Sequence, residues 1–427
     1  MNRRTFLKTS CLAMAPLVLP SGLLRGQSPS NKITLGFIGM GSQGIRRNLN
    51  SFLRLKNTKV LAVSDCHIKR ANSAKKVVDK AYENKDCVVY QDFREVINRN
   101  DIDAVVISTP DHWHVPMCNM AIEADKDVFC EKPTLTIKEG DELVEKASKK
   151  QTVFQWGIED RYLQKYYYLA GWARSGLIGE ISKVTCKLPS VSPFKREEPA
   201  PVPKGLDWNL WLGPAPYTDY TPSALDIMHW RLNSDYSGGM LTDWGTHLCD
   251  TAQIGIGMEE SGPIEVFGES RTLDPKEFHS DAPVDFKVTY RYANGCEMFV
   301  SDSAEKIRQV LIEFEGTKGW VRCLGWDGKL EASDPNIMKV RSFGPEANYW
   351  QRPPMEQEDF INAVISREKP IYHAEAGNSL CTMLHIGHIA LREGRKVGWD
   401  PKSKSFTTDK QANESSIIYQ RKSRTWD

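Results

Sequence analysis

The sequence lacks the features that mark several broad classes of protein. Its 10 cysteines in 427 residues include no CxxC pair, which argues against a zinc ribbon or a disulfide scaffold. Neither sign of charge predominates, since 56 Lys and Arg oppose 55 Asp and Glu, so binding of nucleic acid through a basic surface is not expected. No internal repeat is evident, and the apolar content of 40% is ordinary for a globular protein. The length is enough for two or three globular domains.

Long apolar runs are also missing, and a run near the N-terminus, from Cys11 to Leu19, is too short for a bilayer, which takes about 20 apolar residues. This run follows Arg3 and Arg4 in the stretch Asn-Arg-Arg-Thr-Phe-Leu-Lys. A paired-arginine region before a short apolar run is typical of a twin-arginine signal. We therefore expect a signal peptide over residues 1–30, export of the folded protein to the periplasm and no stable membrane insertion. An N-terminal anchor or a stray apolar helix is the alternative.

A strand, a glycine-rich turn and a helix are predicted in succession after Lys32. The apolar run 33–38 ends in Gly-Met-Gly-Ser-Gln-Gly, and a helical stretch follows over 45–55. In the motif G-x-G-x-x-G the first glycine permits a tight turn, the second lets the backbone approach a pyrophosphate, and the third lets helix and strand pack closely. The free N–H groups of the helix N-terminus then face the phosphates. The cofactor-binding residues predicted here are Gly39, Met40, Gly41, Ser42, Gln43 and Gly44.

A second strand, 59–64, ends at Asp65, about twenty residues after the glycines. A carboxylate at this position can accept hydrogen bonds from both hydroxyls of an adenine ribose and would repel a 2′-phosphate. No arginine follows Asp65 immediately to hold such a phosphate. The predicted cofactor is therefore NAD, with NADP less favoured.

Two further apolar strands, 103–108 and 127–130, continue the alternation of strands and helices. Ligands of such parallel sheets bind at the carboxyl ends of the strands. His112 and His114 form a His-x-His pair that could be read as metal ligands. No carboxylates or cysteines accompany the pair at the spacing of a metal site, so no metal is predicted. The residues predicted at the crevice are Thr109, Pro110, His112, His114, Glu131 and Lys132.

The second half of the chain predicts a mainly antiparallel sheet with several helices. A strand is expected over 179–187, and alternating runs over 284–300 flank the Asn-Gly of a hairpin. A further strand pair is expected around Gly316, and helices are expected over 355–366 and 374–392. The segment 189–222, rich in Pro and Trp, is expected to be irregular.

The glycine turn, the segment Thr109-Pro-Asp-His-Trp-His114, the triplet Glu131-Lys-Pro133 and the later Asp243-x-x-x-His247 together resemble the Gfo/Idh/MocA family of oxidoreductases. The resemblance covers roughly residues 32–401. It implies an α/β protein with an N-terminal Rossmann domain and a C-terminal α/β domain whose large, mainly antiparallel open sheet often mediates oligomers. The expected domains are 31–155 for NAD binding and 156–427 for substrate and oligomer contacts, with C-terminal helices that return to the first domain. A homodimer or homotetramer is the default.

By the same resemblance, Lys132, Asp243 and His247 are the expected catalytic residues. A neutral imidazole can take the proton of an alcohol near neutral pH while a hydride leaves for a nicotinamide. The Lys132 ammonium can hydrogen-bond the same oxygen and stabilise its alkoxide character. If a helix starts near Met240, Asp243 and His247 share one face, and Asp243 can orient the imidazole or bind an adjacent hydroxyl.

Substrate contacts are expected from aromatic and cationic side chains near these residues. Aromatic rings stack on the C–H faces of sugars, and Arg binds vicinal hydroxyls. Most tryptophans of a large domain nevertheless fill its core, and that interpretation stays open for each of them. The predicted substrate residues are Arg161, Tyr162, Trp211, His229, Trp230, Arg231, Asp243 and His247.

Two functions remain open. The first is an NAD-dependent dehydrogenase acting on a ring hydroxyl of a sugar, glycoside or polyol. The second resembles the family's redox-neutral glycosidases, in which a transient ketone permits elimination and the hydride then returns. Export would favour a tightly held cofactor in either case. The dehydrogenase is preferred, because the exported N-acetylgalactosaminidase group typically places its histidine in Tyr-Pro-Thr-His-Gly, whereas His247 lies in Asp-Trp-Gly-Thr-His.

Overall fold

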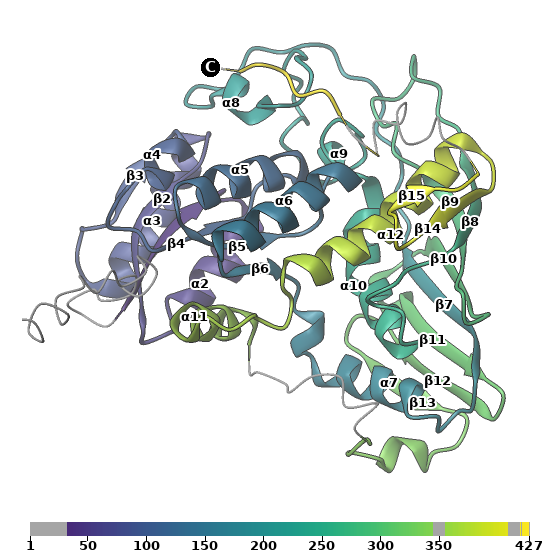
Figure 1. Ribbon diagram of the computed structural model, residues 1–427. Helices are drawn as coiled ribbons and strands as arrows, with labels where there is room; N and C mark the ends of the chain where they lie inside the picture. The colour runs from purple at the N-terminus through teal and green to yellow at the C-terminus, as the bar shows by residue number, and fades with distance from the viewer. Residues whose placement is uncertain (1–31, 345–354, 409–418, 420, 427) are drawn as a thin grey trace, which may run out of the picture.

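The computed structural model describes residues 32–344, 355–408, 419 and 421–426. The predicted signal peptide lies outside these residues and stays a prediction. The described residues form two domains, each built on one sheet, with a long helix between them (Figure 1). None of the helices in the described ranges combines the length and the apolar character needed to cross a membrane.

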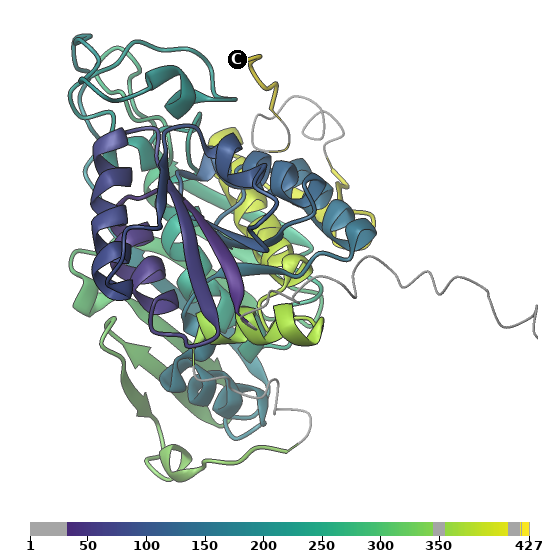
Figure 2. The same cartoon turned by 90° about the vertical axis from the view of Figure 1, so that its left-hand side faces the viewer.

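The first domain is a parallel sheet of six strands in the order β3-β2-β1-β4-β5-β6. Its central strands are buried throughout because helices cover the sheet on both sides (Figure 2). This is the predicted Rossmann arrangement. Its strands are β1 (Ile33–Ile38), β2 (Thr58–Ser64), β3 (Val88–Tyr90), β4 (Ala104–Ile107), β5 (Asp127–Glu131) and β6 (Phe154–Gly157), and its helices are α3 (Ile68–Tyr82), α4 (Phe93–Ile97), α5 (Asp111–Glu123) and α6 (Ile137–Lys150).

The helix predicted over 45–55 begins two residues earlier and has an unusual start. Its first part is a π-helical segment, η2 (Gln43–Leu49), which runs into the short α2 (Asn50–Phe52). The glycine turn therefore leads directly into helical backbone, as the motif requires.

The second domain is a sheet of nine strands in the order β13-β12-β11-β7-β10-β9-β8-β14-β15. Its pairs are antiparallel except for β7 with β10, so the predicted mainly antiparallel sheet is confirmed. The predicted Asn-Gly hairpin joins β9 to β10, and the pair around Gly316 is β11 with β12. The strands are β7 (Ile181–Pro189), β8 (Glu265–Arg271), β9 (Val284–Arg291), β10 (Glu297–Ala304), β11 (Leu311–Gly316), β12 (Gly319–Leu324), β13 (Lys329–Ala332), β14 (Val397–Asp400) and β15 (Ser405–Phe406).

Helices of the second half cover one side of this sheet and connect it to the first domain. The predicted helices over 355–366 and 374–392 are confirmed as α11 and α12, and the predicted start near Met240 is that of α10. The helices are α7 (Gln164–Arg174), α8 (Trp208–Leu212), α9 (Ile227–Arg231), α10 (Gly239–Gly255), α11 (Glu356–Ser366) and α12 (Ala374–Glu393), with the 3₁₀ turns η3 (Asp160–Tyr162), η4 (Ile307–Gln309) and η5 (Ile337–Lys339).

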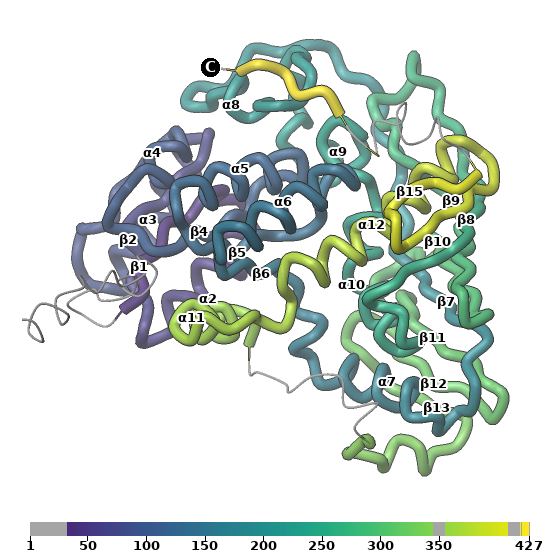
Figure 3. Tube along the Cα trace, in the orientation of Figure 1, coloured from purple at the N-terminus to yellow at the C-terminus, as the bar shows by residue number. Residues whose placement is uncertain are grey.

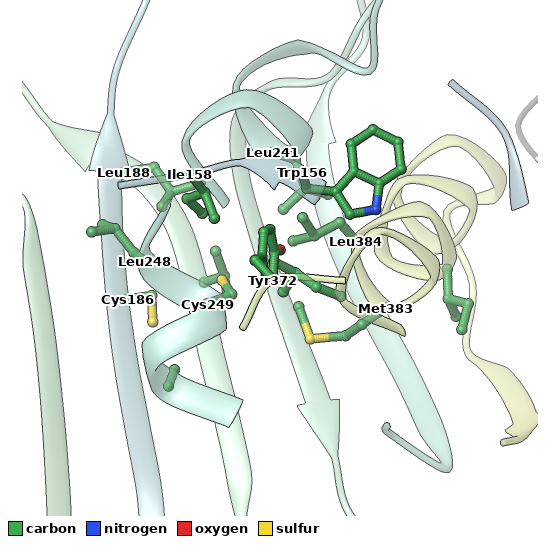
Figure 4. Close-up of a cluster of buried hydrophobic side chains, with 14 of the residues drawn as sticks. Trp156, Ile158, Cys186, Leu188, Leu241, Leu248, Cys249, Tyr372, Met383 and Leu384 are labelled. Carbon is green, nitrogen blue, oxygen red and sulfur yellow. The ribbon is translucent and has the colours of Figure 1, made fainter. Parts of the chain in front are cut away.

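The helices α10 and α12 form the centre of the molecule. α10 packs against α7, α12 and β7, and for this reason nearly all of its side chains are buried. Leu241 and Leu248 of α10 meet Leu384 of α12 and Trp156 of β6 in one apolar cluster (Figure 4). This continuous core fixes the position of α10 relative to the parallel sheet.

The helix α11 belongs to the first domain in space, although it lies far away in the sequence (Figure 1). Phe360 packs edge-to-face against Phe52 at 6.2 Å and against Phe129 at 5.7 Å between ring centroids. At the end of α11, Arg367 pairs with Asp127 at the start of β5. A division of the chain at residue 156 therefore separates the parallel sheet from a helix that completes its core.

The C-terminal residues run back over the segment that carries α8 (Figure 3). Trp426 packs edge-to-face on Trp113 of α5, with ring centroids 4.6 Å apart. Arg424 donates hydrogen bonds to the carbonyl oxygens of Gly213 and Ala215, both at 3.1 Å. The irregular segment after β7 is thus held against the first domain by the end of the chain.

Candidate active site

The glycine turn after β1 has the geometry that the motif predicts. Gly39 has a φ of +86°, and a Cβ atom there would lie 2.6 Å from the carbonyl oxygen of Ser108. A Cβ on Gly44 would lie 2.0 Å from the carbonyl oxygen of Gly39, so helix and turn pack too closely for any side chain. A Cβ on Gly41, by contrast, would meet no atom within 4 Å. Gly41 therefore leaves its backbone open toward the cavity, where a pyrophosphate fits.

Asp65 follows β2, and one of its carboxylate oxygens contacts the glycine turn. Oδ2 accepts a hydrogen bond from the backbone N–H of Met40 at 2.7 Å, and Oδ1 accepts one from that of His67 at 2.8 Å. Burial raises the pKa of Asp65, and the charge of Arg70 opposes this effect. Lys69 and Arg70, which the sequence interpretation did not select, line the same end of the cavity. The residues present fit a dinucleotide, and Lys69 and Arg70 would place cationic groups beside its ribose.

One cavity of about 960 Å³ extends from the glycine turn to α10 and is lined by both domains. It brings together sixteen of the predicted site residues. These are Gly39, Met40, Gly41, Ser42, Gln43, Asp65, Thr109, Pro110, His114, Glu131, Lys132, Trp211, Trp230, Arg231, Asp243 and His247.

Lys132 and Asp243 form a buried ion pair between β5 and α10. The Lys132 ammonium donates hydrogen bonds to Oδ1 and to the backbone carbonyl of Asp243, both at 2.7 Å. Arg231 approaches the other carboxylate oxygen at 3.1 Å. Burial by itself would raise the pKa of Asp243, but the charges of Arg231 and Lys132 outweigh it and hold the pKa well below its usual range. Asp243 is thus a permanent carboxylate that positions Lys132.

His247 is oriented by Asp160 and not by Asp243. Its Nδ1 lies 2.7 Å from Oδ2 of Asp160, a fully buried carboxylate in η3. The expectation that Asp243 orients the imidazole is corrected here: its two oxygens are taken by Lys132 and Arg231, while Asp160 reaches His247 from the end of the parallel sheet. With Nδ1 held, Nε2 is the nitrogen left to exchange a proton with a substrate.

Asp160 could have been found from the sequence. It follows β6 by three residues, at the same carboxyl edge of the sheet that directed attention to Lys132. The chemistry of sugar binding instead favours its neighbours Arg161 and Tyr162 as predicted substrate contacts. A carboxylate after a parallel strand was the available signal.

Five predicted site residues do not line the cavity as the structure describes it. Gly44 packs within the turn, and Nε2 of His112 lies 2.9 Å from the carbonyl oxygen of Trp211. Burial lowers the pKa of His112 to about 3, so it is a neutral structural residue. Arg161 pairs with Asp250, Tyr162 donates to Asp359, and His229 stacks on His279 with ring centroids 4.8 Å apart. These three were predicted to contact substrate; the structure directs them into the protein.

Other cavity residues were not anticipated as part of the site. Asp111, at the start of α5, is buried and accepts a hydrogen bond from Ser237. Burial raises the pKa of Asp111 to about 7 against the opposing charge of Arg231. Further lining residues include Glu159, Leu210, Leu225, Ile227, Trp244, Ile307 and Trp326.

One group of side chains among the described residues has the spacing of possible metal ligands. Glu159, Asp160 and His247 each offer one ligand atom, and these atoms lie within 4.8 Å of one another. The distance of 2.7 Å between Asp160 and His247 is that of a hydrogen bond. The geometry of Asp160 and His247 is therefore that of an imidazole hydrogen-bonded to a carboxylate.

Comparison with known proteins agrees with this geometry. Residues 33–158 match the profile "Oxidoreductase family, NAD-binding Rossmann fold", and residues 167–427 match "Oxidoreductase family, C-terminal alpha/beta domain", the two halves of Gfo/Idh/MocA proteins. The chain belongs to the Gfo/Idh/MocA family. This is a family of oxidoreductases, and the first domain of the chain is an NAD-binding Rossmann domain. The predicted α/β fold class is confirmed.

Curated relatives of this Gfo/Idh/MocA protein are named as glycosidases. It is 31% identical over 153 residues to an alpha-N-acetylgalactosaminidase of Shewanella oneidensis, a match that covers 35% of this chain and 33% of the relative. It is 28% identical over 203 residues to a glycosyl hydrolase family 109 protein of Shewanella baltica, covering 42% and 44% of the two chains. The matched part thus spans about a third to under half of these relatives.

Solved structures of similar fold are named as oxidoreductases. The aldose-aldose oxidoreductase of Caulobacter crescentus superposes with a TM-score of 0.61 at 18% identity, covering 86% of this chain and 99% of the other. The WlbA dehydrogenase of Bordetella pertussis, solved with NADH and UDP-GlcNAcA, gives a TM-score of 0.63 at 15% identity, covering 86% and 98%. At these identities the likeness shows the fold.

Proposed function

We propose that the protein oxidises a ring hydroxyl of a sugar, glycoside or polyol and that NAD takes the hydride. The observation that carries this proposal is the convergence of the glycine turn, the Lys132 ammonium and the His247 imidazole on one cavity. The turn and Asp65 would hold the dinucleotide. Lys132 and His247 would act on the hydroxyl at the other end of the cavity.

The nicotinamide, when bound, supplies the hydride acceptor. His247 takes the hydroxyl proton at Nε2, while Asp160 holds Nδ1 and stabilises the imidazolium that forms. Two N–H groups of Lys132 are occupied by Asp243, which leaves the third for the substrate oxygen. A cation at that oxygen stabilises the negative charge that develops as the C–H bond breaks.

The second candidate is a redox-neutral glycosidase, favoured by the names of the curated relatives. Such a reaction needs a further group that exchanges protons next to the transient ketone. Asp111 lines the cavity, and its pKa of about 7 suits that task. The dehydrogenase remains the first proposal, since every group it needs has a named position in the cavity.

Cellular location, cofactor retention and assembly are part of the same proposal. The paired arginines Arg3 and Arg4 support export of the folded protein to the periplasm. An exported enzyme of this kind would keep its NAD tightly bound, because free NAD is scarce outside the cytoplasm. We propose a homodimer or homotetramer with a small carbohydrate or polyol as substrate.

The test is proton NMR of the purified protein with glucosides, galactosides and inositols in deuterated water. We expect a keto-sugar signal that increases with added NAD or an electron acceptor. Free sugar carrying deuterium beside the oxidised carbon, without net ketone, would replace the dehydrogenase by the glycosidase.

The variant Lys132→Met links that signal to the proposed site. We expect it to abolish ketone formation and to retain NAD, measured by absorbance after gel filtration. Lys146→Met, on the surface of α6, is the control and should keep the activity. A near-normal rate in Lys132→Met would contradict the assignment.

A further inference from the structure

Two isoleucines at the cavity are unusually exposed. Ile227 of α9 is 43% exposed and Ile307 of η4 is 51% exposed, and both line the cavity that holds His247. They come from segments 80 residues apart in the sequence. Large aliphatic side chains left open to solvent beside a reactive group mark a contact for an apolar ligand.

Two tryptophans extend this apolar wall from Ile307 to His247. Trp244 and Trp326 pack edge-to-face with ring centroids 5.1 Å apart. The imidazole of His247 lies 5.2 Å from Trp326 and 5.7 Å from Trp244. An apolar surface thus adjoins the base without a break.

Trp326 is fixed in place before any ligand binds. Its backbone N–H donates to the carbonyl oxygen of Ile307 at 3.1 Å, and its own carbonyl accepts a hydrogen bond from Lys165. The Lys165 ammonium also lies 5.0 Å from the Trp326 ring. An aromatic wall that is already ordered loses little conformational entropy when a ligand packs on it.

The side chains of this wall select for apolar groups. Of Ile227, Ile307, Trp244 and Trp326, the tryptophans offer one indole N–H each and the isoleucines offer no polar atom. For the several hydroxyls of a second sugar this wall offers only these two indole N–H groups, whereas a flat apolar group needs no polar partner.

We infer that Trp244, Trp326, Ile307 and Ile227 form a subsite for the aglycone, and that the substrate is a glycoside with an aromatic aglycone. The sugar ring lies at Lys132 and His247, and the aglycone extends past the tryptophans to the cavity mouth. This inference rests on the proposed function, because it assumes that the sugar hydroxyl is what His247 contacts.

The inference is tested by comparing phenyl and methyl glycosides of one sugar, with the disaccharide as the third ligand. We expect kcat/KM for the phenyl glycoside to exceed that for the methyl glycoside about tenfold, mainly through KM, because one ring is buried. Trp326→Ala and Ile307→Ser should bring this ratio to within about twofold of one. Ile365→Ser, an isoleucine 56% exposed on α11 and remote from the cavity, should leave the ratio unchanged.

Equal values for the two glycosides, a preference that survives both substitutions, or a stronger preference for the disaccharide would overturn the inference. Binding is measured separately by tryptophan fluorescence in NAD-loaded Lys132→Met, where turnover is not needed. Tighter binding of the phenyl glycoside without any turnover in the parent protein would contradict the proposed function and leave the subsite standing. Turnover of both glycosides with equal kcat/KM would support the proposed function and contradict the aglycone subsite.

Discussion

Asp243 and Asp160 hold the two proposed catalytic side chains in different ways. Asp243 is fixed as a carboxylate by Lys132 and Arg231, so it acts on the ammonium. Asp160 is fully buried and contacts the imidazole, and burial raises its pKa against the opposing charge of His247. The carboxylate nearer in sequence to His247 is thus not the one that orients it.

Asp160→Asn tests this division at the level of one residue. The amide oxygen can still accept a hydrogen bond from Nδ1, but the neutral amide no longer stabilises the positive charge of the imidazolium. We expect kcat/KM to fall about 10²-fold or more, and the acid limb of the pH profile to move to lower pH. A loss of activity with an unchanged pH profile would show that Asp160 serves only to hold the fold.

Asp111 predicts a pH dependence of stability. Because burial raises its pKa to about 7, the folded protein binds a proton that the unfolded chain has released above about pH 4. The contribution of Asp111 to stability therefore falls as pH rises from about 4 through 7. The Asn side chain of Asp111→Asn cannot ionise. The free energy of unfolding of this variant, measured with urea, should therefore increase relative to that of the parent protein between pH 5 and pH 8. The exposed Asp86→Asn is the control; a parallel response of Asp111→Asn and the parent protein would contradict the assignment.

At the scale of elements, the C-terminal residues secure the wall of the cofactor cavity. Arg424 and Trp426 hold α8 against α5, and the α8 residues Leu210 and Trp211 line the cavity. Trp113 adds a link, since its indole N–H lies 2.9 Å from the carbonyl oxygen of Trp211.

Removing this contact should loosen the cofactor. We expect the double variant Arg424→Ala, Trp426→Ala to release NAD about tenfold faster. The release rate is measured from the change in protein fluorescence after dilution of the NAD-loaded protein. Lys422→Ala, at an exposed position two residues before Arg424, is the control. Equal release rates would show that the end of the chain is only a surface contact.

At the scale of the whole molecule, α11 and α12 connect the two domains. Phe360 of α11 is fully buried in the first domain, and α12, which follows it, packs on α6 of the first domain and on β8 and α10 of the second. We expect Phe360→Ala to lower the free energy of unfolding by about 3–5 kcal/mol and to keep a single transition in calorimetry. Ile365→Ser, exposed on the same helix, should change it by less than about 0.5 kcal/mol. Two separated transitions would mean that the domains unfold independently.

Local signals account for what sequence reasoning predicted well. The glycine turn, the Asn-Gly hairpin and the helix expected over 374–392 depend on residues close together in the chain, and each is confirmed. The rule that ligands meet the carboxyl ends of parallel strands placed Lys132 correctly on the cavity. The substrate residues were harder, because an Arg or Tyr suited to sugar binding is equally suited to a buried ion pair, as Arg161 is with Asp250.

The sequence by itself determined the dinucleotide-binding turn and most strands and helices, because backbone sterics and hydrophobic periodicity act over short distances. The two-domain α/β architecture and the choice of Lys132, Asp243 and His247 came from the resemblance of its motifs to the Gfo/Idh/MocA family. Only the tertiary structure decided which carboxylate contacts Lys132 and which contacts His247. The contact of Asp160 with His247 joins residues 87 apart, and that of Lys132 with Asp243 joins residues 111 apart. Such partners are chosen when buried charges must find one another in a packed core, and that choice depends on how the sheets and helices come together.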